Sequence, residues 1–309
     1  MGTLQEKAEH LLKHLFYKKE ENRLRSLWRI LVTTSIAITL CLLLVILQFA
    51  INQTLFLGWN VMLAIAVFVA LLIASVFVDK RPFRSFGLHI SGLWAADFAA
   101  GFFIAAAAMT TIVGIMLGMG WARVEDALPL TGISIQSGVL LFFVSMLAVG
   151  FWEEAYFRGY LIINLKEGLN AQSWSRSSQL IAAVFLSSLF FSAGHINNPA
   201  ASVSSTINLI IAGLVLAYPF VRTGSLGLSV GLHASWNFFQ GAVYGLPVSG
   251  ISTEQAIIQT RLTGPESFTG GAFGPEAGAG GLLGLMILLT LSEVYITFAY
   301  KNKKAAPLI

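Results

Sequence analysis

Long apolar segments are the feature of this sequence that most restricts its fold. Eight of them are each about long enough to cross the ~30 Å hydrocarbon core of a bilayer, although the fifth and sixth are short. Only 11% of the 309 residues are charged, against about 25% in soluble domains. We therefore expect an all-α, polytopic membrane protein with eight transmembrane helices. The expected spans are 27–50, 58–78, 93–119, 133–165, 179–195, 206–221, 225–246 and 281–300.

The basic residues indicate how these spans are oriented. Cytoplasmic segments carry an excess of Lys and Arg, and 16 of the 19 lie in the N-terminal arm, in alternate loops and in the C-terminal tail. Arg123 and Arg261 lie on the other side, and Arg158 lies within a span. We expect a multi-pass protein with both termini in the cytoplasm. Because the basic residues mark topology, we expect no nucleic-acid partner.

The chain divides into three expected regions. Residues 1–26 form a cytoplasmic arm, 27–300 the transmembrane domain and 301–309 a cytoplasmic tail. Apolar residues at helical spacing in the arm predict an amphipathic helix on the membrane surface, and a solvated charged arm is an equal alternative. The loop 247–280 is polar, and its Gly-rich stretch "TGGAFGPEAGAGG" is expected to be flexible. We assign no chemistry to this loop. The apolar residues of the arm are Leu4, Ala8, Leu11, Leu12, Leu15 and Phe16.

Three groups of polar residues lie in spans that are otherwise apolar. A charged side chain near the bilayer centre costs about 2.5–3.5 kcal/mol, so such residues are candidates for function. Glu154 and Arg158 are four positions apart and can pair on one helical face, whereas Glu153 is rotated by about 100° and points elsewhere. The groups are Glu153, Glu154 and Arg158 in the fourth span, His195 in the fifth, and His233 with Asn237 in the seventh.

Each group also has a structural explanation. The Glu154–Arg158 pair could join helices, or Arg158 could lie near the membrane surface and snorkel. His195 could be an interior histidine with satisfied hydrogen bonds, and His233 with Asn237 could hold two helices together. The joint occurrence favours function, because hydrolysis needs a carboxylate, imidazoles and an amide that come from separate helices.

Peptide hydrolysis needs a base for water, donors for the developing oxyanion and a proton for the leaving amine. Glu153 in a low-dielectric site is a suitable base. No serine, cysteine or threonine lies in a nucleophile motif, so we expect attack by activated water without a cofactor. A zinc site made by Glu153, His195 and His233 is the alternative, although the H-E-x-x-H motif is absent.

The three groups also match three motifs in a fixed order. "EEAYFR" (153–158) fits EExxxR, "FSAGH" (191–195) fits FxxxH, and "HASWN" (233–237) fits HxxxN. In this order on successive spans, they resemble the CAAX prenyl endopeptidase and bacteriocin-processing (CPBP) family of intramembrane proteases. The motif-bearing part covers roughly 130–246.

The resemblance implies an endopeptidase that cuts near the C-terminus of prenylated CAAX proteins. Its implied partners are membrane lipids and a protein substrate with a prenylated C-terminal peptide, which would enter a conical polar cavity open to the cytoplasm. By similarity, Glu153 activates the water with help from His195. His233 and Asn237 stabilise the oxyanion, and Glu154 with Arg158 holds the site together.

His195 does not fit easily at the depth of the other candidates. With the expected spans it lies ~24 Å from the cytoplasmic face, whereas Glu153 and His233 lie nearer to that face. A fifth helix that starts later, near Ala182, followed by a break in "HINNPAASVSS", would bring His195 to the site.

Two other classes of function would use the same residues. A proton-coupled transporter needs a continuous polar path, and Asp97 is the only other plausible acid within a span. A non-catalytic scaffold or immunity protein would keep the fold without the reaction.

Overall fold

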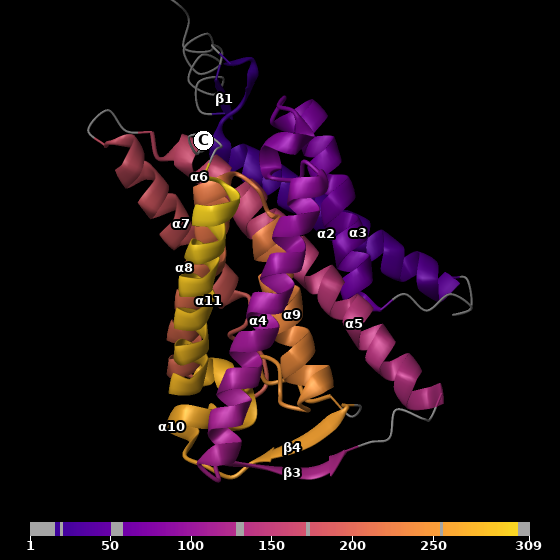
Figure 1. Cartoon of the computed structure of the whole chain (residues 1–309). Coiled ribbons are helices and arrows are strands. Elements are labelled where there is room, and N and C mark those ends of the chain that lie inside the picture. Colours follow the sequence, from indigo (N-terminus) through magenta and orange to yellow (C-terminus); the bar gives the residue numbers. More distant parts are fainter. Residues whose placement is uncertain are drawn as a thin grey trace, which may run out of the picture.

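The computed structural model describes residues 16–18, 21–50, 58–127, 133–170, 174–253 and 256–301. Figure 1 shows a bundle of long helices with a two-stranded sheet, β3–β4, across one end and α6 at the other. Within the described residues, seven helices are long and apolar enough to cross a membrane. The protein is therefore an integral, multi-pass membrane protein. These helices are Ser26–Ala50, Trp59–Val78, Gly92–Gly118, Gln136–Gly168, Arg176–Ala193, Val203–Thr223 and Ala279–Ala299.

Two of these long helices are built from several pieces. The second is α3 (Trp59–Ile73) continued by the π-helical η2 (Ala74–Val78). The fourth is α5 (Ile133–Glu153), the π-helical η4 (Glu154–Leu161) and α6 (Ile162–Gly168). The others are α2 (Ser26–Ala50), α4 (Gly92–Gly118), α7 (Arg176–Ala193), α8 (Val203–Thr223) and α11 (Ala279–Ala299).

The expected seventh span, 225–246, lies in the middle of the bundle. It forms α9 (Gly227–Phe238) and the π-helical η5 (Phe239–Val243), and every residue from Gly227 to Asn237 is buried. It packs against α4, α5 and α8. A Cβ atom on Gly231 would lie 2.1 Å from the carbonyl oxygen of Phe98, so the backbones of α9 and α4 touch there.

A strand pair that the all-α expectation did not include joins two loops. β3 (Ala122–Ala127) pairs antiparallel with β4 (Ile258–Leu262), and Arg123 lies opposite Arg261. Arg261 approaches Glu125 at 3.3 Å. The two basic residues expected on the outer side are thus neighbours on the β3–β4 pair, which lies across one end of the bundle in Figure 1.

The loop 247–280 is ordered where the structure describes it, which corrects the expectation of a flexible segment. It contains β4, α10 (Glu266–Thr269) and two 3-10 turns, η6 (Gly271–Phe273) and η7 (Pro275–Ala277). Backbone hydrogen bonds tie it down, among them Gly250 N–H to the Phe273 carbonyl at 2.8 Å. A further 3-10 turn, η3 (Phe83–Phe86), follows η2.

The N-terminal arm ends in a short hairpin. β1 (Tyr17–Lys18) pairs antiparallel with β2 (Arg23–Leu24), so the expected amphipathic helix does not extend over these residues. Phe16 stacks on Trp28 of α2 with ring centroids 4.3 Å apart. The remainder of the expected helix, 1–15, lies outside the described residues, as does most of the tail at 302–309.

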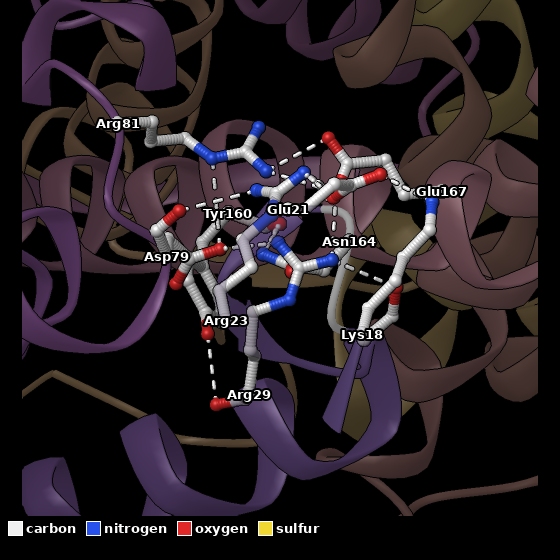
Figure 2. A network of polar contacts seen from close by, with 10 residues as sticks. Lys18, Glu21, Arg23, Arg29, Asp79, Arg81, Tyr160, Asn164 and Glu167 are labelled. Atoms are coloured by element: carbon white, nitrogen blue, oxygen red, sulfur yellow. Dashed lines mark hydrogen bonds and ion pairs between the residues drawn. The ribbon is translucent and has the colours of Figure 1, made fainter. Parts of the chain in front are cut away.

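A network of ionised side chains ties this hairpin to the bundle (Figure 2). Arg29 of α2 reaches Asp79 at 3.0 Å and Glu167 at 2.6 Å. Arg81 also contacts Glu167, at 2.7 Å. Lys18 and Arg23 lower the pKa of Glu21 to about 2, so this carboxylate is ionised throughout the neutral range. Figure 2 also shows Lys18, Arg23, Tyr160 and Asn164 in the same network.

Candidate functional site

A cavity of about 500 Å³ lies between α3, α5, α8, α9 and α11. All four expected catalytic residues line it: Glu153, His195, His233 and Asn237. Most of the remaining lining is apolar. The larger apolar side chains are Trp59, Leu63, Phe142, Met146, Val149, Trp152, Phe157, Phe191, Leu209, Leu216, Trp236, Val248, Ile251, Leu285 and Leu288.

Glu153 is the last residue of α5, and the π-helical η4 starts directly after it. π-Helical turns inside longer helices are frequent at functional sites. The side chain is buried, and its Oε2 has no hydrogen-bond partner within the described part of the chain. The nearest basic atom is Nε2 of His233, 3.6 Å away. Glu153 thus lines the cavity with a carboxylate that has one buried oxygen without a hydrogen-bond partner among the described residues.

Glu154 points to the other side and holds two partners. Its Oε1 accepts a hydrogen bond from Nη1 of Arg158 at 2.9 Å and lies 2.7 Å from Nδ1 of His233. A carboxylate can only accept, so Nδ1 of His233 is the protonated nitrogen and Nε2 faces Glu153. The four-residue spacing predicted the Glu154–Arg158 pair, but it did not indicate the contact between Glu154 and His233 on α9.

Arg158 lies deep inside the protein, so the snorkelling alternative is wrong. The residue is 1% exposed, its guanidinium lies 4.4 Å above the ring of Phe191, and Nη2 donates to the carbonyl of Gly213 on α8. A buried cation with a carboxylate, a carbonyl and an aromatic face is fully surrounded by partners.

Phe191 links the groups of the site and was not among the expected site residues. Its ring centroid is 5.0 Å from that of His195 and 6.0 Å from that of His233. With Arg158 on its face, this ring sets the spacing between the two imidazoles. The signal for it was present, because Phe191 is the first residue of the FxxxH motif.

His195 lies on a turn that directly follows α7. Its Nδ1 is 2.9 Å from the carbonyl oxygen of Phe191, and a carbonyl only accepts, so Nδ1 carries the proton and Nε2 is free to exchange one. The suggested late helix start is wrong: α7 begins at Arg176, with Ser175 as its N-cap. The expected break is present, because α8 begins only at Val203 after a series of turns.

Measured along the chain from the same end of the bundle, His195 lies only ~6 Å deeper than Glu153. Glu153 lies about 15 residues, or ~22 Å along the axis, from Gly168. His195 lies about 19 residues, or ~28 Å, from Arg176 at the same end of the bundle. The expected span had ended too early, at 165.

Asn237 lies one helical turn beyond His233 on α9 and also lines the cavity. Its side chain has no hydrogen-bond partner among the described residues. An amide that lines a cavity and has no other hydrogen-bond partner can donate to an oxygen atom of a ligand.

Sequence reasoning missed six polar residues of the cavity wall, of which two, Asn60 of α3 and Ser145 of α5, hydrogen-bond to each other, and four lie elsewhere. Of these four, two come from the loop 247–280, to which no chemistry was assigned, and two from the turn after α7 and from α8. The four are Ser249, Glu276, Asn198 and Asn208. A signal for the loop was its cluster of glycines, several of which have positive φ and therefore mark tight turns.

The contacts of the two imidazoles leave the zinc alternative (Glu153, His195 and His233) open, because a histidine held at Nδ1 can still bind a metal through Nε2. Nδ1 of His233 is engaged by Glu154 and Nδ1 of His195 by a carbonyl. Among the described residues, no group of three or more His, Cys, Asp or Glu side chains is arranged to hold a metal ion. We therefore derive no step through a metal.

Comparison with known proteins gives one match. Residues 135–239 match the family model described as type II CAAX prenyl endopeptidase Rce1-like. The motif-bearing segment is thus similar to this family. The match runs from α5 through α9 and contains Glu153, His195 and His233. No curated protein and no solved structure matches the chain.

The family match identifies the class of protein that the motifs resemble. An Rce1-like CAAX endopeptidase segment in a chain with seven long apolar helices indicates a membrane-embedded protease of the CAAX-processing type. A protein substrate and a membrane environment follow from that class.

Proposed function

We propose that this protein is an intramembrane endopeptidase in which Glu153 activates water for attack on a peptide bond near the C-terminus of a prenylated protein. One observation carries the proposal: the buried carboxylate of Glu153, whose Oε2 has no hydrogen-bond partner among the described residues, belongs to a residue that lines a cavity together with two imidazoles and an amide. A carboxylate removed from bulk water and left without a donor is a strong proton acceptor.

The first step forms the bond between water and the substrate carbonyl. Glu153 takes one proton from water as the oxygen attacks the carbonyl carbon, and the carbonyl oxygen becomes an oxyanion. Asn237 donates to that oxyanion. His233 joins as a second donor when Nε2 is protonated, and the adjacent carboxylates of Glu153 and Glu154 stabilise that cation.

The second step breaks the C–N bond. The oxyanion collapses, the amine leaves, and the proton that Glu153 took from water passes by way of Nε2 of His195 to the amine nitrogen, so that Glu153 returns to a carboxylate. Nε2 of His195 is available for this transfer because Nδ1 is held by the Phe191 carbonyl. Glu154 and Arg158 keep the ring of His233 in place and take no part in the proton transfer.

The apolar lining supports a lipid-modified substrate. Trp59 and Leu63 of α3 and Phe142 of α5 border the cavity, so an apolar chain could lie there while the peptide reaches Glu153. In this proposal the cavity widens conically toward the cytoplasm, α9 acts as an eighth, shorter crossing and both termini are cytoplasmic, as the distribution of Lys and Arg predicts.

Purified protein in proteoliposomes with a fluorogenic farnesylated peptide tests the proposal. The wild type should cleave the peptide, and Glu153→Gln should lower kcat by about 10²–10⁴-fold, the usual contribution of a general base. Glu125→Gln, at an exposed carboxylate on β3, is the matched control and should cleave normally.

Other outcomes would redirect the proposal. Activity that a chelator removes and zinc restores would favour the metal-dependent reaction. Proton flux that needs Glu153 without peptide cleavage would favour transport, and correct folding with neither activity would favour a scaffold.

A further inference from the structure

The wall of the cavity around His195 is made by three loops that interlock. They are the turn 194–202 after α7, the segment 247–253 after η5, and the segment 270–278 that ends in η7. Each contributes at least one polar side chain to the cavity. Those side chains are His195 and Asn198, Ser249, and Glu276.

Hydrogen bonds connect these side chains in series. Ser249 donates to Oε2 of Glu276 from its backbone N–H at 2.5 Å and from Oγ at 3.2 Å. The carbonyl of Ser249 in turn accepts from Nδ2 of Asn198 at 2.9 Å. Asn198 N–H donates to the carbonyl of His195 at 3.1 Å. A continuous path of hydrogen bonds therefore runs from the Glu276 carboxylate to the backbone of His195.

The loops meet with their backbones in contact, so the path has little freedom to move. Gly250 has φ +83°, and a Cβ atom there would lie 1.9 Å from the carbonyl oxygen of Pro199. Gly274 has φ +99°, and its Cβ would lie 2.1 Å from the carbonyl of Pro247. Only glycine combines this backbone conformation with such close approach.

Glu276 itself is held from α8. Nδ2 of Asn208 donates to the carbonyl of Glu276 at 2.9 Å and to that of Gly278 at 3.2 Å. Burial raises the pKa of the Glu276 carboxyl, while hydrogen bonds from Ser249 act in the opposite direction. The carboxyl and the imidazole of His195 belong to residues that line one cavity.

We infer that Glu276, through Ser249 and Asn198, is a positioning residue that holds the ring of His195 toward the cavity. The inference rests on the proposed function for the role of His195 but concerns a residue outside the three motifs and outside the matched segment. It parallels the other half of the site, where Glu154 holds His233 directly.

Kinetics of four variants separate positioning from a general structural role. Glu276→Ala should lower kcat by about 10- to 100-fold, as displacement of a catalytic group does, with KM changed by less than about twofold. Glu276→Gln should recover most of the loss, because its amide oxygen still accepts from Ser249. Glu266→Ala, at an exposed glutamate of α10, is the matched control.

The decisive comparison is made in the His195→Ala background. If Glu276 acts through His195, Glu276→Ala should cost less than about twofold there, because the two changes are coupled. An equal loss in both backgrounds would overturn the inference, and so would full activity of Glu276→Ala, in each case with the Glu153 result intact.

A spectroscopic measurement keeps the inference testable if the wild type cleaves no peptide. In protein labelled with ¹⁵N-histidine, the signals of His195, assigned with His195→Gln, should show the Nδ1–H tautomer. In Glu276→Ala they should move toward averaged values while those of His233 stay in place. Unchanged His195 signals would overturn the inference, whereas absence of cleavage by the wild type overturns only the proposed function.

Discussion

At the scale of single residues, the site consists of buried charges that are each matched by a partner, with one exception. Arg158 has Glu154, a carbonyl and an aromatic face. Asp97, the acid that a transport path would need, accepts hydrogen bonds from Ser225, Tyr295 and Tyr300 at 3.1, 2.9 and 2.7 Å. It is occupied in joining α4, α9 and α11. The exception is Glu153, which is the reason that the reaction is assigned to it.

The contribution of the buried Glu154–Arg158 pair to the free energy of unfolding can be measured. Arg158→Ala should lower the free energy of unfolding by about 3–5 kcal/mol, because it leaves Glu154 buried without its cation. Adding Glu154→Gln should recover part of that loss. Chemical unfolding in detergent gives both values. Two losses that simply add would show that the pair is not coupled.

A matched control for this prediction lies at the surface. Arg222 pairs with Glu293, and both side chains are 40% exposed. Arg222→Ala should therefore cost no more than about 1 kcal/mol, the usual range of an exposed ion pair.

At the scale of elements, small residues decide how the helices approach. α9 reaches the centre of the bundle because Gly227 and Gly231 allow its backbone to touch α4, and Gly101 of α4 does the same from the other side. This contact places His233 and Asn237 against α5. The position of the two site residues therefore depends on glycines that have no chemistry of their own.

The contact between α4 and α9 predicts that a glycine-to-alanine substitution has opposite effects on stability inside and outside this contact. Gly231→Ala places a methyl group 2.1 Å from the Phe98 carbonyl, so it should lower the melting temperature and the activity together. Gly114→Ala on α4 meets nothing within 4 Å and should raise stability by about 0.5–1 kcal/mol, since alanine favours the helix. Equal melting temperatures for the two variants would contradict the assigned packing.

At the scale of the whole molecule, two groups of charged residues mark the two ends of the bundle. The network of Arg29, Asp79, Arg81 and Glu167 lies at the end with α6 (Figure 2), whereas Arg123 and Arg261 face each other at the end with β3 and β4. Because most Lys and Arg residues lie at the first end, we expect that end to face the cytoplasm.

Accessibility labelling tests this orientation. In a Cys41→Ser background, which removes the chain's one cysteine, Lys80→Cys and Ser267→Cys place single thiols at exposed positions at the two ends. A membrane-impermeant maleimide added to intact cells should label only Ser267→Cys, and in inverted vesicles only Lys80→Cys. The reverse pattern would place the termini outside.

The sequence by itself determined the class of the protein and one face of its site. Apolar runs of membrane-spanning length and the four-residue spacing of Glu154 and Arg158 are local properties, and helical geometry alone converts them into spans and a buried pair. The order of the three motifs likewise indicated the family that the match at 135–239 supports. Of the expected eight spans, seven have the length and composition to cross, and the remaining one is the buried α9.

Only the tertiary structure decided how the site is assembled. The site depends on contacts between segments that are far apart in the chain. Glu154 holds His233, and Phe191 lies between the two imidazoles. Glu276 and Ser249, which hydrogen-bond to each other, line the same cavity as His195. Periodicity carries no information about such contacts, because they depend on how closely backbones approach at glycines and tight turns. The same reason explains why the loop 247–280 looked featureless as sequence and forms one wall of the cavity in the folded protein.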